Sequence, residues 1–301
     1  MPLATAAHSA LRPVDAVALA RVQQRLLRAA EPPWLHGEVA RRMAERLSVI
    51  RLQPSRVVDW GSFLGASQAQ LAQAYPKAQR VAVEPDGARC AATAARHKQP
   101  WWQPWRSAAA VLTPSELAGG EAQLVWSNMV LQGVPDPAAV LAAWHRALAV
   151  DGFLMFSTLG PGSLRQLDAL YARQAWPAAH APFVDMHDLG DMLVAAGFAD
   201  PVMDQEIITL TWTSPQAMLD ELRAMGGNVA AGRWPGLRTP RWRDQLLSRL
   251  GQLADAEGRL AMDFEVVYGH AFRPLPRPRL SGQTEVPLAD MRAMVRRSQK
   301  S

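Results

Sequence analysis

Short runs of apolar and β-branched residues alternate along the chain with segments whose apolar residues recur at helical spacing. The runs predict strands at 56–60, 80–84, 123–128, 152–158, 206–212 and 264–270, with a further short strand within 101–120. The helical segments lie at 66–75, 86–97, 137–148, 163–174 and 187–196. This alternation favours an α/β fold in which parallel strands are joined by helical crossovers.

The two ends of the chain and one long insertion depart from this alternation. Residues 1–50 form an N-terminal segment with helices broken near Glu31-Pro32-Pro33, and an α/β domain would span 51–273. Helices at 215–225 and 241–256 separate the sixth and seventh strands, so we expect a helical cap at about 215–259. The Pro- and Arg-rich tail, 274–301, is expected to be disordered.

Composition limits the function classes. Apolar residues make up 49% of the 301 residues and charged residues 20%, which is the balance of a soluble globular protein. No apolar stretch reaches the roughly 20 residues that span a bilayer, and no secretory signal is evident, so we expect a cytoplasmic protein without a membrane partner. Cys90 is the only cysteine and the histidines are scattered, so no metal site is expected. The net charge is +5, but no nucleic-acid module accompanies it.

A candidate nucleotide cradle follows the first strand. The run Val57 to Gly65 is an apolar strand that ends in a glycine-containing turn and opens a helix. Ligands of open α/β sheets bind at the carboxyl ends of strands, where glycines let the backbone approach and a helix N-terminus offers free N–H groups. We therefore predict that Asp59, Gly61 and Gly65 contribute to a cofactor site. A strand-turn-helix unit without a ligand is the alternative.

Two further strand ends carry polar residues at matching places. Glu84 ends the second strand, about 20 residues beyond the glycine turn, where a carboxylate can accept both hydrogen bonds from a ribose diol. Ser127 and Asn128 end the fourth strand. We predict that Glu84 and Ser127 bind the cofactor. An exposed loop carboxylate and a capping asparagine are the alternatives.

Five segments carry a more specific signal than the strand ends do. Their residues, 124–132, 156–165, 185–191, 226–233 and 264–270, resemble those of the malonyl-[acyl-carrier protein] O-methyltransferases of biotin synthesis, which are class I S-adenosylmethionine-dependent methyltransferases. The resemblance covers about 41–273 and includes the cap. It implies a Rossmann-like methyltransferase fold, with a mostly parallel seven-stranded sheet, an antiparallel last strand and a helical cap inserted before that strand.

The resemblance also implies an activity. S-adenosyl-L-methionine would donate a methyl group to the free carboxylate of malonyl-acyl carrier protein, an early step of biotin synthesis. That carboxylate is already ionised at neutral pH, so catalysis needs orientation more than a base. Asn128 would face the transferred methyl group. Arg233, with Arg223 as a second candidate in the cap, would hold the malonyl oxygens.

The departures from the family pattern concern the cofactor half. Phe63 stands in place of the middle glycine of the first motif, and the stretch Pro104 to Ser107 has no acid where the family has one near the adenine. We expect Phe63 to crowd the cofactor, so that Phe63→Gly tightens binding. Two alternatives stay open: a weak or inactive paralogue that binds an acyl carrier protein or another partner, and a methyltransferase with another small-molecule acceptor.

Overall fold

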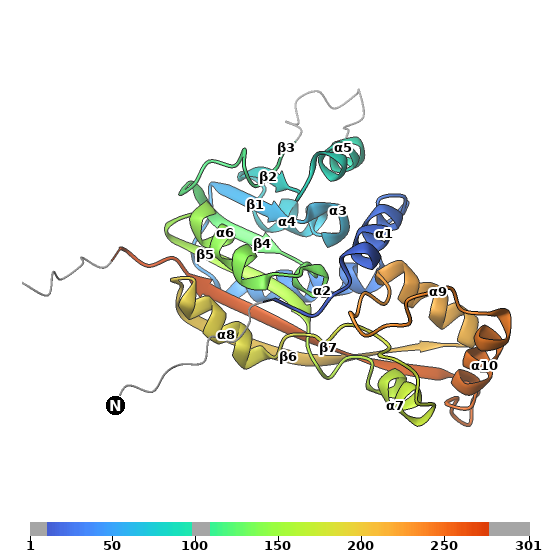
Figure 1. Ribbon diagram of the computed structural model, residues 1–301. Coiled ribbons are helices and arrows are strands. Elements are labelled where there is room, and N and C mark those ends of the chain that lie inside the picture. Colours follow the sequence, from blue (N-terminus) through green and yellow to red (C-terminus); the bar gives the residue numbers. More distant parts are fainter. Residues whose placement is uncertain (1–10, 98–108, 277–301) are drawn as a thin grey trace, which may run out of the picture.

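A single mixed sheet organises the chain. The computed structural model describes residues 11–97 and 109–276, so the stretch 104–107 and nearly all of the expected disordered tail lie outside the described residues. The strands are β1 Arg56–Trp60, β2 Gln79–Val83, β3 Ala110–Leu112, β4 Ala122–Ser127, β5 Leu148–Leu159, β6 Ala199–Trp212 and β7 Leu260–Phe272. Their order is β3-β2-β1-β4-β5-β7-β6, in which β1 to β5 are parallel and β7 is antiparallel to both β5 and β6 (Figure 1). The predicted fold class is confirmed.

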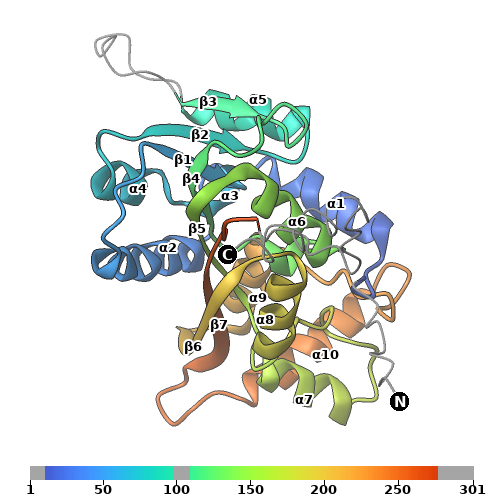
Figure 2. The same ribbon diagram turned by 90° about the vertical axis from the view of Figure 1, so that its left-hand side faces the viewer.

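Helices cover both faces of the sheet because its strands are apolar on both sides. Along β5, Phe153 and Met155 enter one buried cluster, whereas Leu154 and Phe156 enter the other. The first cluster includes α2 (Trp34–Arg46) and α4 (Gln68–Ala74), and the second includes α6 (Pro137–Ala147) and α8 (Met186–Ala195). Figure 2 shows α2 and α4 on the opposite side of the sheet from α6 and α8. The three-layer arrangement leaves the carboxyl ends of β1, β2 and β4 together at one edge.

Several predicted elements have other bounds in the structure: β5 and β7 each begin four residues before the expected start, and the second helix of the cap ends at Gly251, five residues before the expected end. The helix expected at 66–75 is α4, which begins at Gln68, and the preceding turn contains a short helix, α3 (Ser62–Gly65), that ends at Ala66, whose backbone is left-handed with φ of 53°. The sixth strand begins at Ala199, seven residues before the expected start. Its first half contains Pro201 and polar residues, which an edge strand tolerates because one side faces solvent.

The N-terminal segment crosses the carboxyl edge of the sheet. In Figure 1, α1 (Ala16–Leu26) lies beside α3 and α9 (Pro215–Met225). The Arg25 guanidinium donates to the carbonyls of Arg223 and Gly226, and Val14 forms a β-bridge with Ala230. These contacts join the start of the chain to the insertion between β6 and β7.

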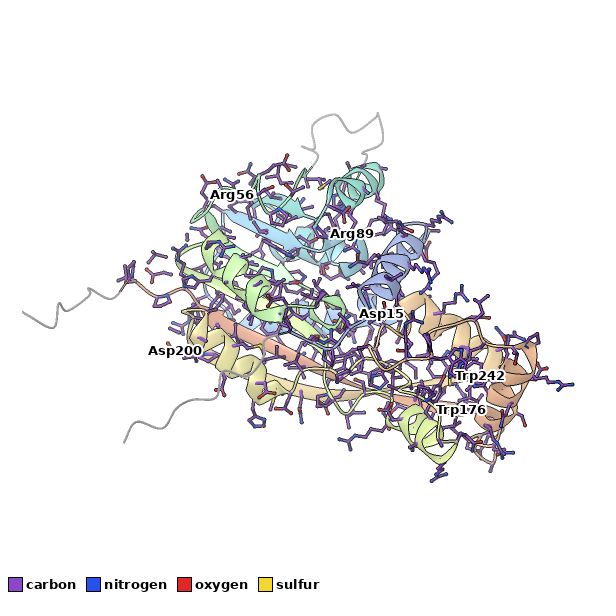
Figure 3. All side chains as sticks on the ribbon, in the orientation of Figure 1. Asp15, Arg56, Arg89, Trp176, Asp200 and Trp242 are labelled. Atoms are coloured by element: carbon purple, nitrogen blue, oxygen red, sulfur yellow. The ribbon has the colours of Figure 1, made fainter. Side chains whose placement is uncertain are left out.

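The insertion consists of α9 and α10 (Pro240–Gly251), which pack with α7 (Arg165–Arg173) at the far end of β6 and β7 (Figure 1). Trp176 and Trp242 lie close together there (Figure 3), and their ring centroids are 5.2 Å apart. The Arg238 guanidinium lies over the Trp242 ring, 4.3 Å from its centroid. The remaining short helices are α5 (Gly87–Arg96) after β2, η1 (Leu47–Val49) after α2, and η2 (Leu131–Gly133) after β4. None of the described helices is both long and apolar enough to cross a bilayer.

Candidate functional site

The turn after β1 requires a glycine. Gly61 has φ of 75°, in the left-handed region, and a Cβ atom built there would lie 2.5 Å from the Cγ2 atom of Val130. The loop after β4 therefore approaches the β1 turn so closely that only a glycine fits. Phe63, by contrast, is not among the described residues with positive φ, so its position does not require the glycine that the family pattern carries.

Glu84 ties this turn to the end of β2. Its Oε1 atom accepts hydrogen bonds from the backbone N–H of Phe63 at 2.6 Å and from the Thr93 hydroxyl at 2.9 Å. The side chain is only 1% exposed, and burial raises the pKa of Glu84 to about 7, although both hydrogen bonds oppose that rise. Among the described residues no donor is bonded to Oε2, which leaves this oxygen for a ligand.

Asp59 supports the turn from behind. It accepts a 2.7 Å hydrogen bond from the Ser62 hydroxyl, while its Oδ1 atom is buried without a partner among the described residues. Burial raises the pKa of Asp59 to about 6. Asp59 lines a small internal void and not the large cavity described below. The structure therefore places Asp59 behind the turn that follows β1, where it does not face the large cavity.

A large cavity opens where these strand ends meet the N-terminal segment and the cap. Its volume is about 600 Å³, and it extends from the β1 turn and Glu84 to α7 and α9. Its lining is mostly apolar and includes Leu19, Val22, Trp60, Gly61, Phe63, Glu84, Arg89, Val130, Leu159, Tyr171, Phe183, Leu222 and Arg223. A mostly apolar cavity with a few polar groups is the usual form of a small-molecule site.

Only two of the seven predicted site residues line this cavity, namely Gly61 and Glu84. Asn128, expected to face the methyl group, is 1% exposed and makes all its bonds inward. Its Nδ2 atom donates to the carbonyls of His36 and Gly65 at 2.7 and 2.5 Å, and its Oδ1 accepts from the Ser157 hydroxyl at 2.6 Å. An amide with these partners is a buried clamp between α2, the β1 turn and β5.

Ser127 and Gly65 also lie outside the lining of the cavity. Ser127 is fully buried, and its hydroxyl donates to the Trp60 carbonyl at 3.2 Å. Gly65 accepts the Asn128 bond described above, and a Cβ atom there would lie 3.7 Å from the Asn128 carbonyl oxygen. In this structure both residues hold β4 against the β1 turn.

Arg233, the expected malonyl-binding residue, does not line the cavity either. Its Nε and Nη2 atoms lie 2.9 and 2.8 Å from Oδ2 of Asp15, the residue that caps α1. Figure 3 shows Asp15 at the junction of α1 with the cap. Arg223, the second candidate, does line the cavity, is exposed, and has no ion pair or side-chain hydrogen bond within the described residues.

Three lining residues were missed by the sequence reasoning. His36 is buried on α2, and its Nδ1 atom lies 2.8 Å from the Leu64 carbonyl oxygen. Burial lowers the pKa of His36 to about 4, so the ring is neutral and Nε2 is an acceptor. His180 contacts Asp168 at 3.0 Å and stacks on Phe183. Arg12, in the N-terminal segment, is the third. A single histidine or arginine outside a motif carries no spacing signal, so nothing in the sequence selects these three residues.

Comparison with known proteins finds relatives over most of the chain. A methyltransferase-domain family model matches residues 34–200. A malonyl-[acyl-carrier protein] O-methyltransferase of Gallionella capsiferriformans is 40% identical over 82% of this chain and 87% of its own. A protein of the same name from Laribacter hongkongensis is 43% identical over 81% and 84%.

Solved structures share the fold at low identity. YcgJ of Bacillus subtilis has a TM-score of 0.53 at 10% identity, covering 79% of this chain and 99% of its own. The [4+2]-cyclase SpnF has a TM-score of 0.50 at 14% identity, covering 86% and 94%.

The fold, the glycine turn and the family match define a Rossmann-like methyltransferase that uses S-adenosyl-L-methionine. Within that class, the chain belongs to the family of the malonyl-[acyl-carrier protein] O-methyltransferases.

The residues present fit the cofactor. The Gly61 turn leaves no room for a side chain, and the Oε2 atom of Glu84 is available at the cavity wall. Phe63 narrows the wall but is turned against α5, where the Arg96 guanidinium stacks over its ring at 3.7 Å. When bound, the cofactor supplies an electrophilic methyl group. Glu84 would orient its ribose, and the Gly61 turn would allow close backbone approach.

Proposed function

We propose that the protein transfers the methyl group of S-adenosyl-L-methionine to the free carboxylate of a malonyl thioester carried by an acyl carrier protein. The observation that supports this most strongly is the continuous cavity from Glu84 to Arg223, together with the name shared by the similar relatives. A place early in biotin synthesis is part of the same proposal.

The reaction asks little of the chain beyond orientation. The malonyl carboxylate is ionised at neutral pH, so its oxygen can attack the methyl carbon without a general base. The new O–CH₃ bond forms as the S–CH₃ bond breaks, and the sulfonium charge and the carboxylate charge are both lost. An apolar lining favours this loss of charge, because water no longer stabilises the separated ions. Leu159, Leu222 and Phe183 provide such a lining.

In this proposal Arg223, and not Arg233, is the cap arginine that faces the acceptor. Arg233 is already paired with Asp15, whereas Arg223 lies on the cavity wall. Arg25 stands close by: burial, and after it the charge of Arg223, lower the pKa of Arg25. Two arginines at one end of the cavity create a positive potential there, which would attract an acidic carrier protein.

The proposal is tested by a methyl-transfer assay with purified protein, S-adenosyl-L-methionine and malonyl-acyl carrier protein, following both the ester and S-adenosylhomocysteine. Acetyl-acyl carrier protein is the matched control because it lacks only the carboxylate. We expect turnover with the malonyl thioester and none with the acetyl thioester. A folded protein that binds the cofactor but methylates no malonyl thioester would overturn the proposed acceptor.

A further inference from the structure

Arg12 is buried between two walls of the cavity. It is 9% exposed, and it precedes α1 in the N-terminal segment. Its Nε and Nη2 atoms donate to the Pro182 carbonyl at 3.1 and 2.8 Å, and its Nη1 atom donates to the carbonyls of Gln132 and Val134 at 2.5 and 3.2 Å. The guanidinium therefore bridges the loop after β4 and the loop before α8.

All these partners are neutral. Within the described part of the chain no carboxylate lies at ion-pair distance from Arg12, whereas Arg42, Arg46 and Arg233 each have at least one. Burial lowers the pKa of Arg12, and no nearby acid opposes that effect. A buried charge that is bonded to carbonyls but has no opposite charge beside it is costly to desolvate.

A ligand in the cavity could supply the missing opposite charge. Arg12 is a lining residue, and Nη2 carries two hydrogens but has a single acceptor, the Pro182 oxygen, in the described structure. A guanidinium with a free N–H at a mostly apolar cavity wall favours a carboxylate over neutral ligands. We propose that Arg12 is the buried counter-charge for a carboxylate bound in this cavity.

Other cations of the cavity suit this role less well. Arg223 is exposed, so water screens its charge. Arg89 stands 3.9 Å from the Asp86 carboxylate, and His180 contacts the carboxylate of Asp168 at 3.0 Å. Arg12 alone among these four combines burial with the lack of an acidic partner within the described residues.

Two carboxylates could occupy the position, the amino-acid end of the cofactor or the malonyl group, and the second rests on the proposed function. Calorimetry with S-adenosylhomocysteine and with 5′-methylthioadenosine, which lacks the amino-acid end, tests the first source without any acceptor. The KM for malonyl-acyl carrier protein, against the Kd for acetyl-acyl carrier protein, tests the second. Failure of the proposed function thus removes only the second arm.

The variants are Arg12→Met, which removes the charge, and Arg12→Lys, which keeps it. Arg273→Met is the matched control, because its guanidinium also binds backbone carbonyls, those of Arg146 and Leu148, but lies outside the cavity lining. We expect Arg12→Met to weaken the binding of one of the two carboxylate ligands by about 10- to 100-fold, and Arg12→Lys to weaken it by less than about fivefold. Neither variant should change binding of the matching ligand without a carboxylate.

Several results would overturn the proposal. One is equal weakening of S-adenosylhomocysteine and methylthioadenosine, or of malonyl and acetyl carrier protein, because a purely structural clamp affects both members of a pair. Another is an Arg12→Met variant that weakens the binding of both carboxylate ligands no more than Arg273→Met does. If Arg12→Met does not fold, Arg12→Lys decides. A loss of affinity of about 10-fold that is equal for the ligands with and without a carboxylate would contradict a role of charge.

Discussion

The backbone N–H of Phe63 donates a 2.6 Å hydrogen bond to Oε1 of Glu84, so the carboxylate that should bind a ribose also fixes the cofactor turn. The same oxygen accepts from Thr93, and both bonds leave Oε2 free of donors among the described residues. The two oxygens of Glu84 therefore have different surroundings. One oxygen holds the backbone of the turn, and the other is available at the cavity wall.

This division predicts the effect of Glu84→Gln. The glutamine keeps an oxygen for the turn but loses the charge that strengthens hydrogen bonds to the ribose hydroxyls. We expect S-adenosyl-L-methionine to bind more weakly by about 1.5–3 kcal/mol, measured by calorimetry. Thr93→Val is the matched control, since it removes one bond to Oε1 and leaves the charge. Unchanged affinity in Glu84→Gln would remove Glu84 from the site.

The raised pKa of Glu84 predicts a pH dependence. Between its usual value of 4.5 and the folded value of about 7, the folded protein keeps a proton that the unfolded chain has released. The free energy of unfolding of the ligand-free protein should therefore decrease as pH rises through this window. Cofactor affinity should change in the opposite direction, because the ribose hydroxyls donate to the ionised carboxylate.

We expect the cofactor affinity to fall by up to about tenfold per pH unit below about pH 7 and to level off above it. Titrations at pH 5.5, 6.5, 7.5 and 8.5 would measure this, with Glu84→Gln giving a much flatter profile. Asp59, whose pKa burial raises to about 6, would contribute stability changes of the same sign. A wild-type affinity that is constant across this range would contradict the role of Glu84.

The Phe63→Gly variant now has a different expected outcome. From the sequence, removal of the ring should tighten cofactor binding. In the structure the ring is 4% exposed and stacks under Arg96, whose guanidinium also binds the carbonyls of Phe63 and Ala29. We therefore expect a loss of about 3 kcal/mol in the free energy of unfolding and weaker cofactor binding, because the connection to the N-terminal segment is loosened. Urea unfolding and calorimetry test both, and tighter binding would restore the original interpretation.

Much of the fold was predictable because apolar strands and glycine turns are local signals. The run 56–60 and the helix 215–225 agree with β1 and α9 at both ends. The start of β6 was not predictable. This strand lies at the edge of the sheet, and the polar residues of its first half conceal the alternation of apolar and polar positions. The break at Ala66 depends on a left-handed backbone that alanine rarely adopts, so composition gave no sign of it.

The residues that line the cavity were predictable only where their position follows from the backbone. Gly61 and Glu84 lie at strand ends, and topology brings such ends together. Asn128 lies at a strand end too, but its orientation depends on Ser157 and His36, which are distant in sequence. Arg233 was placed in the cap correctly, yet its partner Asp15 is 218 residues away. Side-chain direction and long-range pairing are tertiary properties that one sequence does not display.

The Asn128 clamp predicts a stability effect. Asn128→Ala removes three buried hydrogen bonds and leaves the carbonyls of His36 and Gly65 without this donor. We expect the free energy of unfolding to decrease by about 3 kcal/mol, measured by urea denaturation. The neighbouring Ser127→Ala is the matched control: its hydroxyl makes a single bond, to Trp60, and should cost about 1 kcal/mol. An Asn128→Ala protein as stable as wild type but inactive would instead support the catalytic role predicted from the sequence.

The two cap arginines should affect the enzyme through different constants. Arg223 lies on the cavity wall, so Arg223→Ala should raise the KM for malonyl-acyl carrier protein by about 3- to 10-fold while cofactor affinity stays constant. Because the side chain is exposed, the wild-type advantage should shrink as salt is raised. Arg233 instead binds Asp15 at the start of α1, so Arg233→Gln should act through the position of that helix.

A double-mutant cycle separates these roles. Asp15→Asn keeps the helix cap but loses the ion pair, so its effect on kcat/KM and that of Arg233→Gln should be far from additive when the two are combined. Arg223→Ala combined with Asp15→Asn should be close to additive, because no contact joins those two side chains in the described structure. A different result would favour Arg233 as the acceptor cation, as expected from the sequence. In that case Arg233→Gln raises the KM for the malonyl thioester more than Arg223→Ala does, and it does so equally in the Asp15→Asn background. The ion pair with Asp15 must then open when the substrate binds.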